Sequence, residues 1–418
     1  MSLFLRDATH INWRTLAITR SHIKVESGPG GGISFVDAIP AGAEVLDCAG
    51  QLVTRSFVNG HHHIYSALAR GMPPPARQPR SFNEILELIW WNLDKRLDHD
   101  MIRASALVSA IEAVRCGCTF IIDHHASPNA AEGSLGIIAE ALESVGVGHL
   151  LCYELSDRDG PRSREAGLAE SKHHLEHHRG LVGLHASFTV SDELLEQAVE
   201  IARRHDTGVH IHVAEAESDE EHCRRTYGCS VAERLHRAGA LDLTGTLLAH
   251  ALHVDDAERE LIRSSGAWVV HNTQSNQNNN VGSFDPGGLG DRIFIGTDGM
   301  HNDMAEAARA MYLEGQTVGG LAPMQAYTRL RRVHDYLDSL RVTGDAENNL
   351  VVLDYPSPTP ITEQNWPAHV VYGLSSRHVR ATISSGRVVY RDGRVLQTDA
   401  EQITAMANEQ AKRLWKLL

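Results

Sequence analysis

Short apolar runs alternate with longer amphipathic stretches through the middle of the chain. Helical periodicity is clear at residues 101–117 and 192–208, and Gly208 closes the second stretch as a helix C-terminal signal. The apolar runs predict eight strands, at residues 57–63, 119–125, 149–154, 182–188, 209–215, 247–254, 267–275 and 293–299. Because eight strands with helical crossovers are typical of a (β/α)₈ barrel, we expect an α/β fold of the TIM-barrel type.

The two ends of the chain have a different pattern, with short strand-like runs and frequent turns. Gly386 and the Asp392-Gly393 pair are turn signals. Strands are predicted at residues 16–25, 33–39, 348–355, 368–373 and 379–396. We therefore expect residues 1–55 and 348–418 to form a composite β-sandwich domain with a C-terminal helix. Residues 56–347 would then form the catalytic barrel domain.

Composition narrows the class of protein. The chain has 418 residues, 42% hydrophobic and 22% charged, which is ordinary for a globular enzyme. A net charge of −14 argues against binding to nucleic acid or to an anionic membrane surface. No run of 18 apolar residues is present, so we expect no membrane span, and we expect no secretory signal. The six cysteines lack the spacing of a disulfide framework. We expect a cytoplasmic protein with reduced thiols that forms a homo-oligomer, a dimer or larger.

Polar residues gather at the carboxyl ends of the predicted strands, where a TIM barrel builds its active site. The metal-ligand types among them are His61, His63, His212, His250 and Asp298. Any one of them could be a structural histidine or a turn aspartate, and with 26 histidines in the chain only position is informative. Imidazoles with one carboxylate suit a borderline metal such as zinc, with a coordination position left for water. The shared location favours ligation.

Neighbouring residues sharpen this hypothesis. His61 and His63 share a strand face, so His62 should point away from the metal. Glu215 follows His212 by three residues, where its carboxylate could reach the water. A second histidine-rich segment, KHHLEHHRG, has i,i+4 spacing, but it is strongly polar and we interpret it as a solvated helix face. The paired tryptophans of LIWWNLDKRLD are interpreted as core or lid packing, and PPPARQPR as a loop or a mobile lid.

These motifs resemble those of a known family. The spacing HxH…HxxE…H…D is similar to that of the amidohydrolase superfamily, in its mononuclear cytosine/guanine-deaminase-like branch. The segments FVNGHHHIYSALARGM, FIIDHHASP, LHASFTVSDELL, HIHVAEAESD and VHNTQSNQNNNVG are most similar to SsnA-type aminohydrolases. The chain departs from the branch in reading HNTQSN where HNPxSN is usual, and in a shortened segment at residues 311–347 whose details stay open.

The resemblance implies roles for individual residues. It implies metal ligands at His61, His63, His212 and Asp298, and catalytic roles for Glu215, His250 and Asp298. The tip of strand four carries His185 where a carbamylated lysine would be needed to bridge two metals. We therefore expect one divalent metal per chain, with zinc favoured and iron as the alternative.

The predicted function is a metal-dependent aminohydrolase. Metal-bound hydroxide would attack an amino-substituted nitrogen heterocycle, such as a purine, pterin or pyrimidine, and release ammonia. Asp298 would help to activate the water, His250 would orient it, and Glu215 would protonate the ring nitrogen. Alternatives are a cyclic amide hydrolase and a hydrolase of another ring substituent, although Glu215 weighs against chlorohydrolase-like members. A non-enzymatic, assembly-forming relative would be expected to have lost ligands, and none is lost here.

Polar strand-tip residues that the metal does not need are candidate substrate contacts. They are His185, His124, Gln274 and Asn276. These groups offer hydrogen bonds and little formal charge, which suits a neutral planar heterocycle better than a phosphorylated compound. His185 could instead be a core histidine bonded to the backbone. The sequence leaves the exact substrate, the native metal and the oligomer size open.

Overall fold

The computed structural model describes residues 2–418, and its largest unit is a barrel of eight parallel strands. The strands, in order around the barrel, are β6 (Phe57–His62), β7 (Cys118–His125), β8 (Gly148–Leu155), β9 (Val182–Ala186), β10 (Val209–Val213), β11 (Leu247–His250), β12 (Trp268–His271) and β13 (Ile293–Ile295). A parallel bridge between His62 and Asp298 brings the last strand back to the first. The TIM-type fold predicted from the apolar runs is confirmed.

Helices connect and surround the strands of this barrel, as the amphipathic stretches predict. They are α3 (His99–Arg115), α4 (Ser134–Val145), α5 (Pro161–His177), α6 (Asp192–Arg204), α7 (Glu217–Tyr227), α8 (Val231–Arg237), α9 (Asp256–Ser264), α10 (Thr273–Asn279), α11 (Met304–Thr317), α12 (Pro323–Arg331) and α13 (Val333–Ser339). Three short helical turns, η1 (Ile64–Ala69), η3 (Ser187–Thr189) and η4 (Ser376–His378), lie in connections. The shortened segment at residues 311–347 therefore still contains the end of α11 and the two helices α12 and α13.

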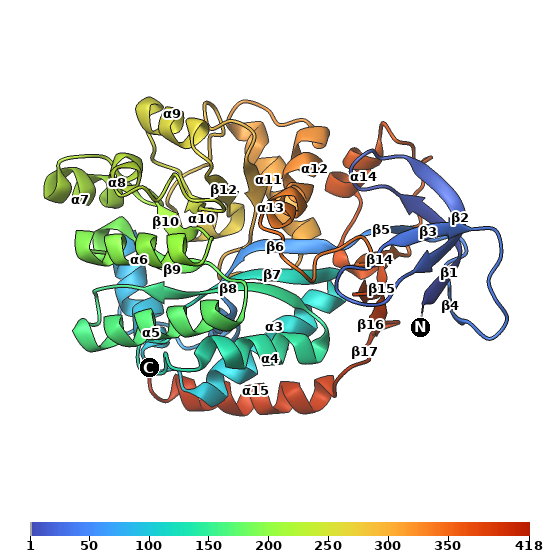
Figure 1. Cartoon of the computed structure of the whole chain (residues 1–418), viewed down its shortest axis with the longest axis horizontal. Helices are drawn as coiled ribbons and strands as arrows, with labels where there is room; N and C mark the ends of the chain where they lie inside the picture. Colours follow the sequence, from blue (N-terminus) through green and yellow to red (C-terminus); the bar gives the residue numbers. More distant parts are fainter. Residues whose placement is uncertain (1) are drawn as a thin grey trace.

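The two ends of the chain meet in one mixed sheet of nine strands beside the barrel (Figure 1). Its N-terminal strands are β1 (Leu3–Ile11), β2 (Ile18–Val25), β3 (Ile33–Val36), β4 (Glu44–Asp47) and β5 (Leu52–Arg55). Its C-terminal strands are β14 (Leu350–Leu353), β15 (Val379–Ser384), β16 (Arg387–Arg391) and β17 (Arg394–Val395). β5 pairs with β14 and joins the two ends, and the sheet has an apolar core of its own. The division of the chain near residues 55 and 348 stays a prediction.

Two C-terminal segments pack on the barrel and not on this sheet. The strand predicted at residues 368–373 is wrong, because this segment forms the helix α14 (Trp366–Tyr372) with Pro367 in its first turn. Helix-compatible spacing buries Trp366, Val370 and Val371 against α11 and α12. The C-terminal helix α15 (Ala400–Trp415) lies along α3 (Figure 1), where the indole of Trp415 donates to the backbone oxygen of Leu68.

A single helical segment covers the mouth of the barrel after the loop at residues 73–80. It consists of α1 (Phe82–Ile85), the π-helical turn η2 (Leu86–Trp90) and α2 (Trp91–Asp94). Ser81 caps its start by accepting a hydrogen bond from the backbone nitrogen of Glu84. Because π turns inside helices are frequent at functional sites, we expect this segment to contribute residues to a pocket.

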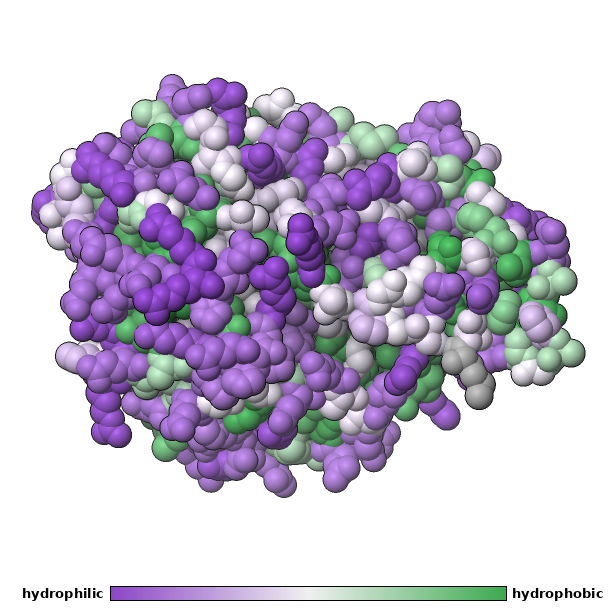
Figure 2. Space-filling view, viewed as in Figure 1, coloured by the Kyte–Doolittle hydropathy of each residue, from purple (hydrophilic) through white to green (hydrophobic). Residues whose placement is uncertain are grey.

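The outer surface is mainly polar. Hydrophilic side chains cover most of the face seen in Figure 2, and the green and white patches gather toward the end where the terminal sheet lies. Among residues 2–418, none of the helices is long and apolar enough to cross a membrane. The predicted oligomer and cytoplasmic location stay predictions.

Candidate metal centre and active-site pocket

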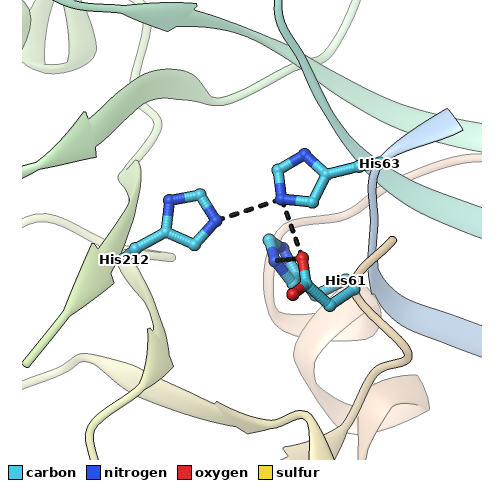
Figure 3. Close-up of side chains that lie close together, drawn as sticks. His61, His63 and His212 are labelled. Atoms are coloured by element: carbon cyan, nitrogen blue, oxygen red, sulfur yellow. Dashed lines mark hydrogen bonds and ion pairs between the residues drawn. The ribbon is translucent and has the colours of Figure 1, made fainter. Parts of the chain in front are cut away.

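Three histidines and one aspartate converge at the carboxyl ends of the barrel strands. Nε2 of His63 lies 3.1 Å from Nε2 of His212 and 2.9 Å from Oδ1 of Asp298 (Figure 3). Nε2 of His61 lies 3.4 Å from the same carboxylate oxygen. One donor atom from each of these four residues lies within 4.8 Å of the other three. The structure thus brings together the four ligands that the family resemblance implies.

The opposite ring nitrogens of these histidines are held by the protein. Nδ1 of His63 bonds to the backbone oxygen of His124 at 2.7 Å, and Nδ1 of His212 bonds to that of His185 at 2.8 Å. A carbonyl can only accept, so these Nδ1 atoms carry the proton and Nε2 keeps its lone pair for the centre. Such outer hydrogen bonds are what orient the imidazoles of metal sites.

Two further observations test whether a metal fits. Nε2 of His61 is buried and has no hydrogen-bond partner among the described residues, so a ligand atom is left uncompensated. Burial lowers the pKa of His61 to about 3, which keeps its imidazole neutral as ligation requires. Burial also lowers the pKa of His63, but the Asp298 carboxylate outweighs it and raises that pKa to about 9. A divalent cation among these donors would replace that proton, and the donor set fits one.

Backbone strain marks the same strand ends. His250 has φ 72°, Asp298 has φ 54° and Ala214, just before Glu215, has φ 45°. Residues other than glycine rarely adopt this left-handed region, and they do so mainly where function demands it. The turn at Ala214 directs the following Glu215 into the barrel mouth, whereas His250 and Asp298 are themselves the turn residues. As predicted, the side chain of His62 points away and bonds to Asp298 O and Ser109 Oγ.

Glu215 and His250 form a second polar pair beside the four presumed ligands. Oε2 of Glu215 lies 3.5 Å from Nε2 of His250, and Asn279 donates a hydrogen bond to Oε1 of Glu215 at 3.3 Å. Nδ1 of His250 bonds to Oδ1 of Asn276 at 2.7 Å, which directs Nε2 toward the centre. Burial raises the pKa of Glu215 to about 7. A carboxyl group of this kind can give up or take up a proton near neutral pH.

A pocket opens onto this centre, with a cavity volume of about 60 Å³. One part of its wall is reactive, with His63, His212, Glu215 and Asp298. The remaining lining residues include Tyr65, Phe82, Leu86, Trp90, Trp91, Asp94, Glu154, Arg158, His185, Ser275, Asn278, Asn279 and Met300. The paired tryptophans, interpreted from sequence as core or lid packing, thus belong to a helical segment that covers the pocket.

The four predicted substrate contacts are placed differently from one another. His185 lines the pocket, with Nδ1 bonded to Thr189 Oγ1 at 2.7 Å. His124 is fully buried against backbone oxygens of Leu184 and His210 and does not line the pocket. Gln274 faces His301 and Glu306, and Asn276 supports His250 from behind. Of the four, only His185 remains a proposed substrate contact.

The reason for this difference lies in the local structure after His271. The sequence predicts a strand through residue 275, in which alternate residues would share a face. The structure ends β12 at His271 and begins α10 at Thr273. Helical spacing then directs Ser275, Asn278 and Asn279 to the pocket. Glu154, by contrast, lies at the carboxyl end of β8. Its position at a strand tip could have identified it from the sequence as a pocket residue.

The histidine-rich segment of α5 forms a separate cluster. His173, Glu176 and His177 lie close together but are exposed. The prediction of a solvated helix face agrees with these three residues but is wrong for His174 of the same segment, which is buried.

Comparison with known proteins identifies the family. A model of the amidohydrolase family matches residues 52–389. The chain belongs to the amidohydrolase family. It is 26% identical over 403 residues to a 5′-deoxyadenosine deaminase of Methanothermobacter thermautotrophicus, covering 88% of this chain and 89% of that protein.

Solved structures agree with this family assignment at the level of the fold. An adenosine deaminase from Xanthomonas campestris with bound zinc matches with a TM-score of 0.84 at 17% identity, over 99% of this chain and 98% of the other. The atrazine chlorohydrolase TrzN from Arthrobacter aurescens, complexed with zinc, matches with a TM-score of 0.80 at 16% identity, over 98% and 100%. Both likenesses support the barrel fold described above.

Proposed function

We propose that this amidohydrolase removes an amino group from a nitrogen heterocycle by hydrolysis. The observation that carries the proposal is the pair Glu215 and His250, placed beside four metal-ligand groups at the end of one pocket. The relative from Methanothermobacter thermautotrophicus bears the name of a deaminase acting on 5′-deoxyadenosine, which supports the reaction class. Zinc is the proposed metal and iron the alternative, bound by His61, His63, His212 and Asp298.

The proposed reaction divides the proton transfers between two carboxylates. A bound divalent cation supplies Lewis acidity, which makes water a competent nucleophile near neutral pH. Asp298 accepts a proton from the attacking water, and Nε2 of His250 orients that water toward the amine-bearing carbon. Glu215 donates its proton to the adjacent ring nitrogen. Asp298 then passes its proton to the amino group, the carbon–nitrogen bond breaks and ammonia leaves. The hydroxyl proton passes to Glu215, and the ring keeps the oxygen as an oxo group.

The pocket wall supports a ring as the substrate. Thr189 donates its hydroxyl hydrogen to the backbone oxygen of Ala186, so its oxygen accepts from Nδ1–H of His185. Nε2 of His185 is therefore an acceptor at the pocket wall. Tyr65, Trp90 and Trp91 add flat aromatic surfaces, which suit a planar heterocycle.

Hydrolysis of another ring substituent is the second candidate, because the chlorohydrolase TrzN shares the fold. Product analysis separates the two candidates. Zinc-loaded protein is incubated with a panel of aminopurines, aminopyrimidines and aminopterins, with chlorinated counterparts and with cyclic amides. The proposal predicts ammonia from the amines. Release of chloride only, ring opening only, or turnover of phosphorylated nucleotides alone would contradict it.

A further inference from the structure

A second polar cluster of the pocket, around Arg158, has no part in the reaction proposed above. The Arg158 side chain is only 7% exposed, and it lines the pocket just after β8. Its Nη2 contacts Oδ2 of Asp94 and lies 3.2 Å from Oε1 of Glu154. Asp94 ends the helical segment that covers the pocket, so this ion pair joins that segment to the barrel.

Only Nη2 of Arg158 and Oδ2 of Asp94 take part in the contact between these two side chains. Nη1 of Arg158 and Oδ1 of Asp94 are both buried, and neither has a hydrogen-bond partner within residues 2–418. In a bidentate pair both nitrogens would face both oxygens. Nε of Arg158 also lacks a hydrogen-bond partner, but it lies 3.1 Å from Oδ2 of Asp159. Nη1 of Arg158 and Oδ1 of Asp94 are thus the donor and the acceptor left over from this ion pair. Buried polar atoms of this kind are costly unless a water or a ligand completes their hydrogen bonds.

Aromatic rings connect this cluster with the metal centre. The Arg158 guanidinium carbon lies 5.2 Å from the Trp91 ring centre, and the Trp91 ring lies 5.7 Å from the His185 ring. The His185 ring in turn lies 5.7 Å from that of His212, a presumed ligand. One flat molecule can therefore face the reactive groups at one end and Arg158 at the other.

Charge around Arg158 excludes one class of ligand. Three carboxylates surround its guanidinium, those of Asp94, Glu154 and Asp159. A single cation among them has no positive charge left for a phosphate or a substrate carboxylate. The free Nη1–H and the free carboxylate oxygen instead match a neutral partner with one acceptor and one donor side by side.

We propose that Arg158 and Asp94 recognise the lactam edge of the substrate, its adjoining ring carbonyl and ring N–H. Nη1 of Arg158 donates to the carbonyl oxygen, and Oδ1 of Asp94 accepts from the N–H. Resting on the proposed deaminase function, this names the substrate class as an amino-oxo heterocycle. Arg158 and Asp94 are specificity-determining residues, and they take no part in the proton transfers.

Matched substrate pairs test this assignment. Guanine and 2-aminopurine differ by a lactam edge, as do isocytosine and 2-aminopyrimidine. Zinc-loaded wild-type protein should prefer the lactam member of each pair by about 100-fold in kcat/KM, because a site built for hydrogen bonds rejects an analogue that lacks them. Arg158→Lys keeps the charge but loses the planar fork. It should reduce this preference to about tenfold or less by slowing the lactam member alone.

Controls keep the test independent of folding. Arg164→Lys alters a nearby arginine that pairs with Asp157 and Glu193 outside the pocket, and it should leave the preference unchanged. Asp94→Asn is a second variant that removes the acceptor charge, and it should shift the preference in the same direction as Arg158→Lys. Equal slowing of both members of a pair by Arg158→Lys, or a preference that follows the ribose of guanosine, would overturn the assignment.

Binding of compounds without an amino group separates this inference from the proposed function. Quenching of tryptophan fluorescence can follow hypoxanthine, which has a lactam edge, and purine, which lacks one. Tighter binding of hypoxanthine that Arg158→Lys abolishes would support the lactam assignment even if no amine released ammonia. Equal binding of the two compounds would overturn it, even if lactam-free amines proved to be substrates.

Discussion

The metal centre and the wall around Arg158 lie in one pocket but are built in different ways. The presumed ligands come from the tips of β6 and β10 and from the residues just after β6 and β13. The Arg158 wall comes from α2, the end of β8 and the loop after it. The carboxyl ends of the barrel strands lie at one face of the barrel, so four ligand atoms from different strands can converge there. Loops and lid helices vary freely, and they are suited to choosing the substrate.

The largest expected effect is the loss of a ligand. His63→Ala should lose its metal and all measurable turnover, because His63 is the residue whose Nε2 faces both His212 and Asp298. Elemental analysis and ammonia release measure the two properties. The control is the double variant His173→Ala/His177→Ala on α5, which should keep both. If the α5 variant lost its metal while His63→Ala retained it, the metal site would have to be assigned to α5 and not to the strand ends.

The next effect separates catalysis from metal binding. Glu215→Gln keeps the shape and the hydrogen bond from Asn279 but cannot transfer a proton. It should retain metal while kcat falls by about 10²–10⁴, the usual contribution of a positioned acid. Ammonia release under saturating substrate is the measurement. A kcat close to that of the wild type would show that the pair Glu215 and His250 is not catalytic.

A smaller effect is expected on the substrate side of the pocket. His185→Ala removes an acceptor from the wall and should lower kcat/KM by about tenfold, as one buried hydrogen bond would. Its metal content should be unchanged. Gln274→Ala is the matched control, since this side chain bonds to His301 and Glu306 away from the pocket. If Gln274→Ala impaired kcat/KM more than His185→Ala did, the placement of the substrate would be wrong.

The smallest effect concerns a buried histidine that belongs to neither region. Burial lowers the pKa of His174 from 6.5 to about 3, so between these values the unfolded chain binds a proton that the folded protein does not. The free energy of unfolding should therefore fall as the pH drops below about 6.5, by at most about 1.4 kcal/mol per pH unit from this group. His174→Gln should flatten that dependence in urea titrations, and the exposed neighbour changed in His173→Gln should not. Identical slopes for His174→Gln and the wild type would contradict this.

The sequence predicted the barrel well because its strands and helices follow regular patterns. Apolar runs with polar ends located all eight strands, and His61, His63, His212 and Asp298 lie together in the structure. Family resemblance added the roles of Glu215 and His250, which the geometry is suited to perform.

Predictions failed where the local period changed or where contacts come from distant segments. Residues 368–373 were predicted as a strand because of their apolar content, yet Asn365 and Pro367 begin a helix there. Gln274 and Asn276 were chosen for strand spacing in a segment that is helical. Asp94 and Arg158 are 64 positions apart, and the spacing of residues within either segment does not predict their contact.

A crystallographic anomalous difference map, recorded at the zinc absorption edge from zinc-loaded protein, tests directly whether the four presumed ligands bind one metal ion. We expect a single peak per chain, bounded by Nε2 of His61, His63 and His212 and by Asp298. Glu215 and His250 should lie beside this peak without ligating the metal. Two peaks within the pocket, or a peak held by His173 and His177 with none at the strand tips, would contradict this expectation.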